Sequence, residues 1–142
     1  MAARRDGERE AGAAAVEFAL VSMVLFMLLF GVVQYGFYFW SLQAGSAAAR
    51  EAARQAAVGN LSCTAFDSFV ADRVGPASFG GFVNATRTFG PNPRVGDTVT
   101  VSVTFDSLDL RLPMVPIPED AQVQQQAQTR VENVTAMSVS CS

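Results

Sequence analysis

The stretch GAAAVEFALVSMVLFMLLFGVVQYGFYFW, residues 12–40, decides the fold. It contains the start of a run of 32 residues, from Phe18 to Ala49, that carries no charged side chain. As an α-helix, residues 13–40 would reach about 42 Å, which exceeds the ~30 Å hydrocarbon core of a bilayer. We therefore predict a helix that spans a membrane once.

The helix is expected to continue beyond the membrane. Residues 41–58 are good or neutral helix formers apart from Gly45, and Gly59-Asn60 is typical of a C-terminal stop. These features predict one helix over residues 13–58. The side chains expected at the outer membrane interface are Tyr35, Tyr38 and Trp40.

A cleaved secretory signal is the main alternative for this segment. The apolar core of such a signal is about 7–15 residues long, much shorter than the run found here. Ala47-Ala48-Ala49 nevertheless resembles a small-residue cleavage site, and cleavage there would leave a secreted protein beginning near Glu51. Three arginines before the apolar run and two shortly after it favour a cytoplasmic N-terminus. Residues 1–12 are short and polar, and we expect them to be disordered.

From Leu61 the pattern becomes that of a small β-rich head, residues 61–142. Alternation of valine with serine and threonine predicts a strand over residues 98–105. The fold class is α+β, with a long N-terminal transmembrane helix followed by an extracytoplasmic antiparallel sheet. The other expected elements are an amphipathic helix over 64–74 ended by Gly75-Pro76, strands over 82–89, 121–132 and 134–141, a turn over 90–97 and a proline-rich loop over 112–118. The segment QVQQQAQTRVE is compatible with a helix as well as with a strand.

Composition excludes most catalytic chemistry. The formal net charge is -3, all ten basic residues are arginine, and there is no histidine. Without histidine, lysine or a cluster of cysteines, we expect no enzyme activity, no cofactor and no metal site. The isolated head has no basic patch for nucleic acid. Cys63 and Cys141 are expected to form a disulfide worth about 4 kcal/mol if the head is exported, the alternative being two buried thiols.

One carboxylate, Glu17, lies at the start of the apolar segment. An ionised group inside a bilayer costs roughly 2.5–3.5 kcal/mol, so such residues usually have a function. Cleavage after Gly12 would create an amine on Ala13, about 6 Å of helix rise from Glu17. That amine, or the amine of a neighbouring chain, would pair with the carboxylate and fix the register between helices. The alternative is that Glu17 simply lies among the lipid headgroups.

The order of Gly12, four residues, Glu17, Phe18 and an apolar run resembles the cleavage site of type IV prepilins. It is most similar to the TadE-like pseudopilins, minor subunits of tight-adherence (Tad, Flp or type IVc) pili. AGSAAAREAARQAA is also typical of that family, and DTVTVSVTF, the proline-rich loop and TRVE carry a weaker likeness. The resemblance implies that a prepilin peptidase cuts between Gly12 and Ala13 and removes residues 1–12 as a leader. The last ten residues and the two cysteines depart from the family pattern.

Small residues follow each other at i+4 spacing on the part of the helix beyond the membrane. They form a smooth face that would admit another helix at close range. An exposed linker made of good helix formers is the alternative. Glu51 and Arg54 on the opposite side have the spacing of a weak ion pair. The rows consist of Ala44, Ala48, Ala52 and Ala56, and of Gly45, Ala49, Ala53 and Ala57.

We therefore expect a minor pilin or pseudopilin of a Tad pilus, which supports pilus biogenesis and adhesion. Its partners would be the membrane, the prepilin peptidase, other pilin subunits and host or abiotic surfaces. It would sit in the cell membrane with the head outside, and in the pilus after assembly. The alternative is a non-assembling, single-pass surface domain with an adhesive or receptor-like role. Sequons begin at Asn60, Asn84 and Asn133, and in a bacterial pilus system we expect these to be ordinary turn and strand residues.

Overall fold

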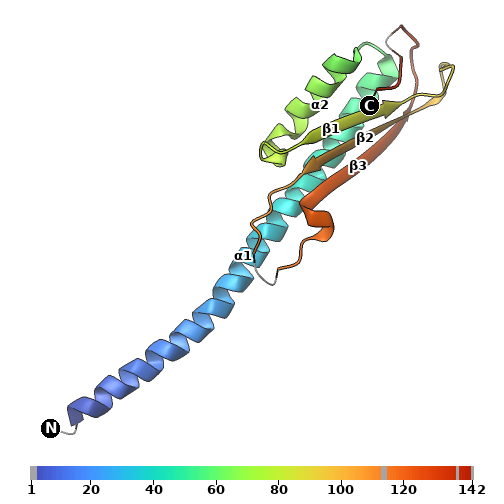
Figure 1. The fold of residues 1–142 in the computed structure, drawn as a ribbon. Coiled ribbons are helices and arrows are strands. Elements are labelled where there is room, and N and C mark those ends of the chain that lie inside the picture. Colours follow the sequence, from blue (N-terminus) through green and yellow to red (C-terminus); the bar gives the residue numbers. More distant parts are fainter. Residues whose placement is uncertain (1–2, 113–114, 137, 142) are drawn as a thin grey trace.

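One long helix carries a small head at its C-terminal end (Figure 1). This arrangement comes from a computed structural model that describes residues 3–112, 115–136 and 138–141, with side chains from residue 12 onward except Glu119. The helix, α1 (Ala3–Val58), has 56 residues. Gly59 ends it with φ of 66°, a value that glycine adopts without strain. The predicted helix over residues 13–58 and the α+β fold class are confirmed.

The start of α1 corrects one expectation. Residues 3–12, predicted to be disordered, are helical and continue directly into the apolar segment. This part of the chain is rich in alanine, arginine and glutamate, which are strong helix formers. Adding residues to an existing helix avoids the cost of nucleation, so a polar extension of this composition is favourable.

The second helix, α2 (Cys63–Ser78), is longer than predicted. Its N-cap is Ser62, whose hydroxyl accepts a hydrogen bond from the N–H of Ala65 at 3.3 Å. The predicted end at Gly75-Pro76 is wrong, because both residues lie inside the helix. Tertiary contacts hold this last turn in place, since Ala77 and Ser78 are buried and the Ser41 hydroxyl of α1 donates to the Ala77 carbonyl at 3.1 Å.

The sheet has three antiparallel strands in the order β1 (Val83–Thr88), β2 (Thr98–Asp106) and β3 (Gln122–Arg130). Val103 of β2 lies opposite Ala85 of β1 and Gln125 of β3. The alternation predicted for β2 is confirmed, because its apolar side chains are fully buried and its polar ones are partly exposed. The QVQQQAQTRVE segment forms a strand rather than a helix. A short 3-10 helix, η1 (Pro118–Ala121), leads into it.

The predicted fourth strand over residues 134–141 is wrong. Within the described part of this segment, only an isolated bridge between Cys141 and Arg87 joins it to the sheet. Val134 and Val139 are exposed, so neither side chain contributes to the core. Two backbone hydrogen bonds between Arg87 and Cys141, at 3.0 and 2.9 Å, hold its end against β1.

The core lies between α1, α2 and one face of the sheet (Figure 1). The close approach of the sheet to α1 depends on small residues. A Cβ atom placed on Gly45 would lie 2.8 Å from Cε1 of Phe105 and 3.1 Å from Cγ of Gln125. Ala52 and Ala56 are completely buried in the same interface. The head is therefore built onto residues 34–58 of α1, and the rest of the helix projects from it.

Candidate functional site

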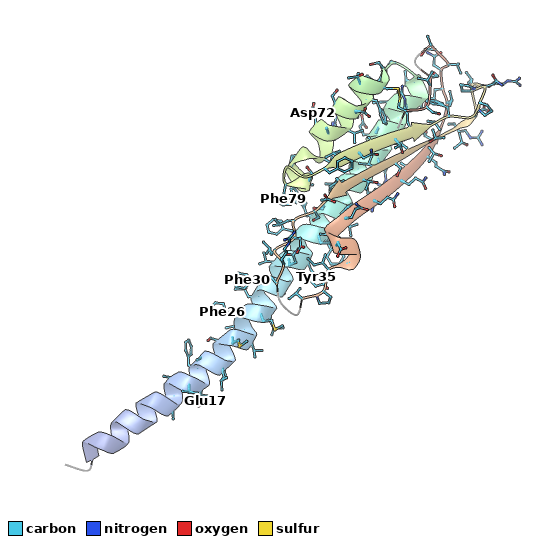
Figure 2. All side chains as sticks on the ribbon, in the orientation of Figure 1. Glu17, Phe26, Phe30, Tyr35, Asp72 and Phe79 are labelled. Atoms are coloured by element: carbon cyan, nitrogen blue, oxygen red, sulfur yellow. A yellow bond between two sulfur atoms is a disulfide. The ribbon has the colours of Figure 1, made fainter. Side chains whose placement is uncertain are left out.

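The half of α1 that projects from the head, residues 13–33, is called here the bare half (Figure 2). It contains 21 residues, which as a helix measure about 31 Å and match a ~30 Å hydrocarbon core. Large apolar side chains cover it and are exposed, for example Phe18 at 74% and Met23 at 71%. By length and composition, α1 is the one helix among the described residues that is long and apolar enough to cross a membrane.

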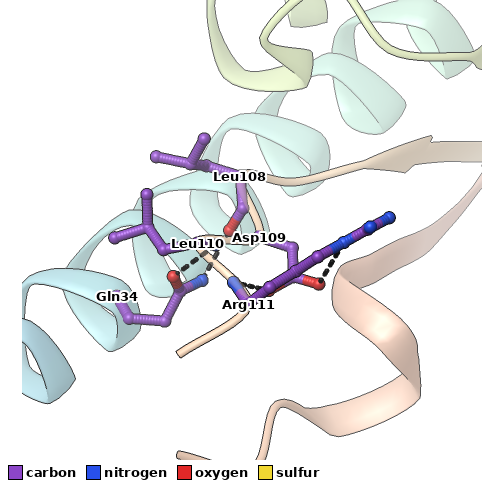
Figure 3. A network of polar contacts seen from close by, with 5 residues as sticks. All are labelled: Gln34, Leu108, Asp109, Leu110 and Arg111. Atoms are coloured by element: carbon purple, nitrogen blue, oxygen red, sulfur yellow. Dashed lines mark hydrogen bonds and ion pairs between the residues drawn. The ribbon is translucent and has the colours of Figure 1, made fainter. Parts of the chain in front are cut away.

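Gln34 marks the boundary where the head begins. Its side chain is only 1% exposed although it lies in an apolar run. Nε2 donates to the carbonyl of Leu108 at 2.5 Å, and Oε1 accepts from the N–H of Leu110 at 2.9 Å (Figure 3). Beside it, the N–H of Arg111 donates to Oδ1 of Asp109 at 2.7 Å. A single amide therefore fixes the loop after β2 to α1.

Two further polar side chains of α1 bond to the head. The Tyr35 hydroxyl donates to the carbonyl of Pro116 at 2.6 Å. Directly after Trp40, the buried Ser41 hydroxyl accepts from the Ser107 hydroxyl at 2.9 Å and itself donates to α2. Gln34 and Ser41 are residues that the sequence alone does not single out. Their only signal is a polar group within a run of apolar side chains.

Aromatic side chains surround the same boundary. Phe79, the left-handed C-cap of α2, meets Phe37 edge-on at 5.5 Å and Trp40 at 5.9 Å between ring centroids. Of the aromatic residues expected at the membrane interface, Tyr35 and Trp40 thus contact the head, and Tyr38 packs on the core. Phe79 remains 44% exposed, so an aromatic surface persists where the bare half leaves the head.

The residues predicted for processing lie at the opposite end of the bare half. Gly12, Ala13, Glu17 and Phe18 are all exposed on α1. Glu17 lies far from the head (Figure 2). Gly12 is helical, and glycine inside a helix costs about 1 kcal/mol relative to alanine. The structure therefore presents the Gly12–Ala13 bond on an accessible and locally weakened stretch of helix, one turn before Glu17.

The chain was compared with protein families, curated proteins and solved structures. Residues 12–54 match the model of the TadE-like protein family. The resemblance inferred from Gly12, Glu17 and the small-residue segment is thereby confirmed for these residues. The TadE-like segment begins at the predicted cleavage site and ends within the part of α1 that carries the head. Neither the curated proteins nor the solved structures gave a match.

The small residues of the TadE-like segment face the chain's own head. Within the two rows, six alanines are between 0% and 3% exposed and pack against the sheet and α2, and Ala44 is half-buried. On the other side of the helix, Arg54 and Glu51 form an exposed ion pair at 3.9 Å. The surface predicted to receive another helix is therefore occupied within one chain. The buried alanines are Ala48, Ala49, Ala52, Ala53, Ala56 and Ala57.

The head is closed by a disulfide between Cys63 and Cys141, as predicted. Beside it, the Arg87 side chain is fully buried and lies over the rings of Phe66 and Phe89, at 5.1 and 5.9 Å. Its Nε donates to the carbonyl of Val139 at 3.0 Å. Burial lowers the pKa of Arg87, and the Asp67 carboxylate acts in the opposite direction. Arg87 therefore ties α2, β1 and the C-terminal segment together, a role that no sequence pattern indicates.

Across the described residues, no group of three or more cysteine, aspartate or glutamate side chains is placed to hold a metal ion. The polar side chains of Gln34 and Arg87 contact backbone groups and aromatic rings of the head. Both side chains join segments of the head that are far apart in the sequence. The feature left for function is the exposed apolar helix and the motif at its start.

Proposed function

We propose that this protein is a minor pilin, or pseudopilin, of a Tad (Flp, type IVc) pilus, a subunit that supports pilus biogenesis and adhesion. The observation that carries the proposal is the division of α1 within the TadE-like segment. Its bare half exposes a continuous apolar surface, and its other half is built into a folded head. Apolar surface costs about 25 cal/mol per Å² in water, so the bare half requires a bilayer before assembly and other subunits afterwards.

In this proposal the leader is removed by a prepilin peptidase at the Gly12–Ala13 bond. Residues 1–12 carry three arginines and three acidic residues, which act as a polar anchor on the cytoplasmic side. Removing them leaves the net charge at -3 but deletes most of the charge that resists movement of the helix out of the bilayer. Processing thus converts a membrane anchor into a segment that can be extracted into a filament.

After cleavage, Glu17 has a partner of opposite charge. The new amine on Ala13 lies about one turn away on the same helix, and in an assembly the amine of a neighbouring subunit takes its place. In surroundings of low dielectric constant, an unpaired carboxylate is costly and a paired one is not. Glu17 therefore selects the axial register in which each carboxylate meets an amine.

The head is placed outside the cytoplasm, with the N-terminus inside. Its disulfide fits an oxidising compartment. From that position the head contacts other subunits in the pilus, and host or abiotic surfaces when the pilus adheres. We place the protein in the cell membrane before assembly and in the pilus afterwards.

Incorporation into filaments tests the proposal. Glu17→Gln keeps the size of the side chain and removes its charge, and Glu51→Gln is the matched control on the exposed side of the same helix. We expect Glu17→Gln to be processed but strongly depleted from sheared filaments, and Glu51→Gln to be incorporated normally. Equal incorporation of both variants would contradict the role given to Glu17.

One observation favours the alternative of a non-assembling anchored domain with an adhesive or receptor-like role. The small-residue face that would receive another subunit is covered by the chain's own sheet and α2. Fractionation separates the two functions. A pseudopilin appears with sheared filaments or with the assembly machinery, whereas an anchored surface domain stays entirely in the membrane fraction.

A further inference from the structure

A groove of about 640 Å³ runs between the bare half of α1 and the loop that follows β2. We call it the membrane-side groove. One wall is formed by α1, including Met27, Leu28, Gly31 and Val32, and the other by Val115 and Pro116. It is an open trough along the helix rather than an enclosed cavity.

The groove exists because α1 has glycine where a side chain would fit. Cβ atoms placed on Gly31 and Gly36 would meet nothing within 4 Å, although both residues line the groove. Each glycine costs a helix about 1 kcal/mol relative to alanine. Gly45 is different, because packing of Phe105 requires it. The chain's own packing does not explain Gly31 and Gly36, so they leave room for something outside the chain.

The polar groups near the groove are turned inward. The Tyr35 hydroxyl donates a hydrogen bond to the Pro116 carbonyl, and Pro116 has no N–H that needs a partner. The N–H of Val115 donates to the carbonyl of Leu112 at 3.3 Å. The walls therefore present hydrocarbon, and a water molecule there would lack the two to four polar partners it needs.

The position of the groove along α1 places it at the depth of the bilayer core. With residues 13–33 in the hydrocarbon, Met27 and Val32 lie within roughly 10 Å of its outer edge. A bilayer that avoided the groove would have to end near Phe26. Its span of about 20 residues would then place Glu17 near the centre, at a cost of roughly 2.5–3.5 kcal/mol, and would also take in Glu8, Arg9 and Glu10 at its inner edge. With residues 13–33 in the hydrocarbon, Glu17 is the only charged side chain in the span and lies near its inner edge, so this placement is favoured.

We propose that the membrane-side groove holds an acyl chain of an outer-leaflet lipid while the protein is anchored, with Val115 and Pro116 inserted beside it. The inference rests on the anchored state, which both candidate functions share. A lipid chain matches the walls because it is long, narrow and without polar groups. The Gln34 and Tyr35 side chains hold the loop against α1 by bonding to the carbonyls of Leu108 and Pro116 and to the N–H of Leu110, so that these backbone groups have partners at this depth.

Fluorescence quenching tests this placement, because Trp40 is the only tryptophan in the chain. Val115→Trp is made in the full chain with Trp40→Phe and reconstituted at low protein density in phosphatidylcholine vesicles with brominated acyl chains. Phe26→Trp in the same background is the control for the bilayer core. Val95→Trp is the control for water, because Val95 lies in the β1–β2 connection and is 69% exposed.

We expect Val115→Trp to be quenched to a similar extent as Phe26→Trp, and Val95→Trp to be unaffected. Adding Gly31→Leu, which fills the groove, should remove part of the quenching in Val115→Trp and none in Phe26→Trp. Quenching of Val115→Trp no greater than that of Val95→Trp would overturn the proposal. Two results together would overturn the proposal and assign the groove to a second copy of the chain. The first is quenching of Val115→Trp that is lost as protein density rises, and the second is cross-linking between copies that is present even at low density.

A measurement on the unmodified sequence guards against misfolding of the variants. Lipids with a photoreactive group in the acyl chain should give adducts on residues 115–116 and 27–32, mapped by mass spectrometry. Adducts confined to residues 13–26 would contradict the proposal. The result is expected to be the same in Gly12→Leu, which blocks processing, so failure of the pilin assignment would leave this test unaffected.

Discussion

The two halves of α1 show opposite relations between side-chain size and burial. The bare half, residues 13–33, carries leucine, phenylalanine, valine and methionine and is exposed, whereas the head-bound half, residues 34–58, buries one face, rich in alanine, against the head. We infer that burial of α1 within the chain depends on how closely the sheet can approach the helix. Small residues allow that approach, and large apolar ones are left for a bilayer or for other subunits.

The largest effect on stability is expected when the disulfide of the head is removed and the bare half is left unchanged. Changing both Cys63 and Cys141 to serine removes a cross-link with a sequence separation of 78 residues. The unfolding free energy of the head should fall by about 4 kcal/mol on the chain-entropy model. In detergent, circular dichroism should show that the bare half stays helical while the head melts earlier. Simultaneous loss of both signals would show that the two halves are not independent.

A smaller effect is expected at the boundary between the halves. Gln34→Leu leaves the Leu108 carbonyl and the Leu110 N–H without their partner. Unsatisfied buried groups cost about 1–3 kcal/mol each, so we expect a loss of about 3 kcal/mol. Faster hydrogen exchange at Leu110 would report it. Gln43→Leu, an exposed position on α1, should leave the exchange rate unchanged, and equal rates in both variants would refute the anchoring role.

Paired glycine substitutions compare the halves directly. Gly45→Ala forces a Cβ atom against the Phe105 ring and should destabilise the head by about 2 kcal/mol. Gly31→Ala meets nothing within 4 Å and should instead stabilise the helix by up to about 1 kcal/mol. Thermal unfolding in detergent gives both values. The same sign for the two changes would contradict the division of α1.

The smallest effect is expected for the ion pair between Arg54 and Glu51 in the half of α1 that carries the head, residues 34–58. Arg54→Ala breaks a contact of 3.9 Å to Glu51, and the Arg54 side chain is 80% exposed. Pairs of this kind contribute about 0.3–0.5 kcal/mol, so the unfolding midpoint should barely move. A large loss of stability in a chemical unfolding curve would mean that this side of α1 also belongs to the core.

The sequence predicts those elements whose pattern is local. The charge-free run and the valine alternation of β2 led to the correct helix and strand, because the run is long enough to cross a bilayer as a helix and the alternation has the period of a strand. The chain after Val134 has apolar residues but no partner strand, so the predicted strand is absent from its described part. The helical continuation through Pro76 depends on contacts with α1 that no local pattern contains.

For the candidate site too, the local motif could be predicted from the sequence and the long-range contacts could not. Gly12 and Glu17 are visible as a spaced motif in the sequence, and residues 12–54 match the TadE-like family. The alanine rows were visible too, but periodicity does not tell whether a helix face meets its own sheet or another chain. Gln34 and Arg87 act through partners more than 50 residues away, the carbonyls of Leu108 and Val139. Such pairings follow only from the folded head.

The central claim is that the chain matures at the boundary between its polar leader and its bare half. Intact-mass spectrometry of the protein from cells that contain the peptidase tests it most directly, with Gly12→Leu and the control Gly7→Leu alongside. We expect a mature chain that begins at Ala13 in the native protein and in Gly7→Leu, and a full-length chain in Gly12→Leu. A native chain that still carries Met1 to Gly12 would contradict it.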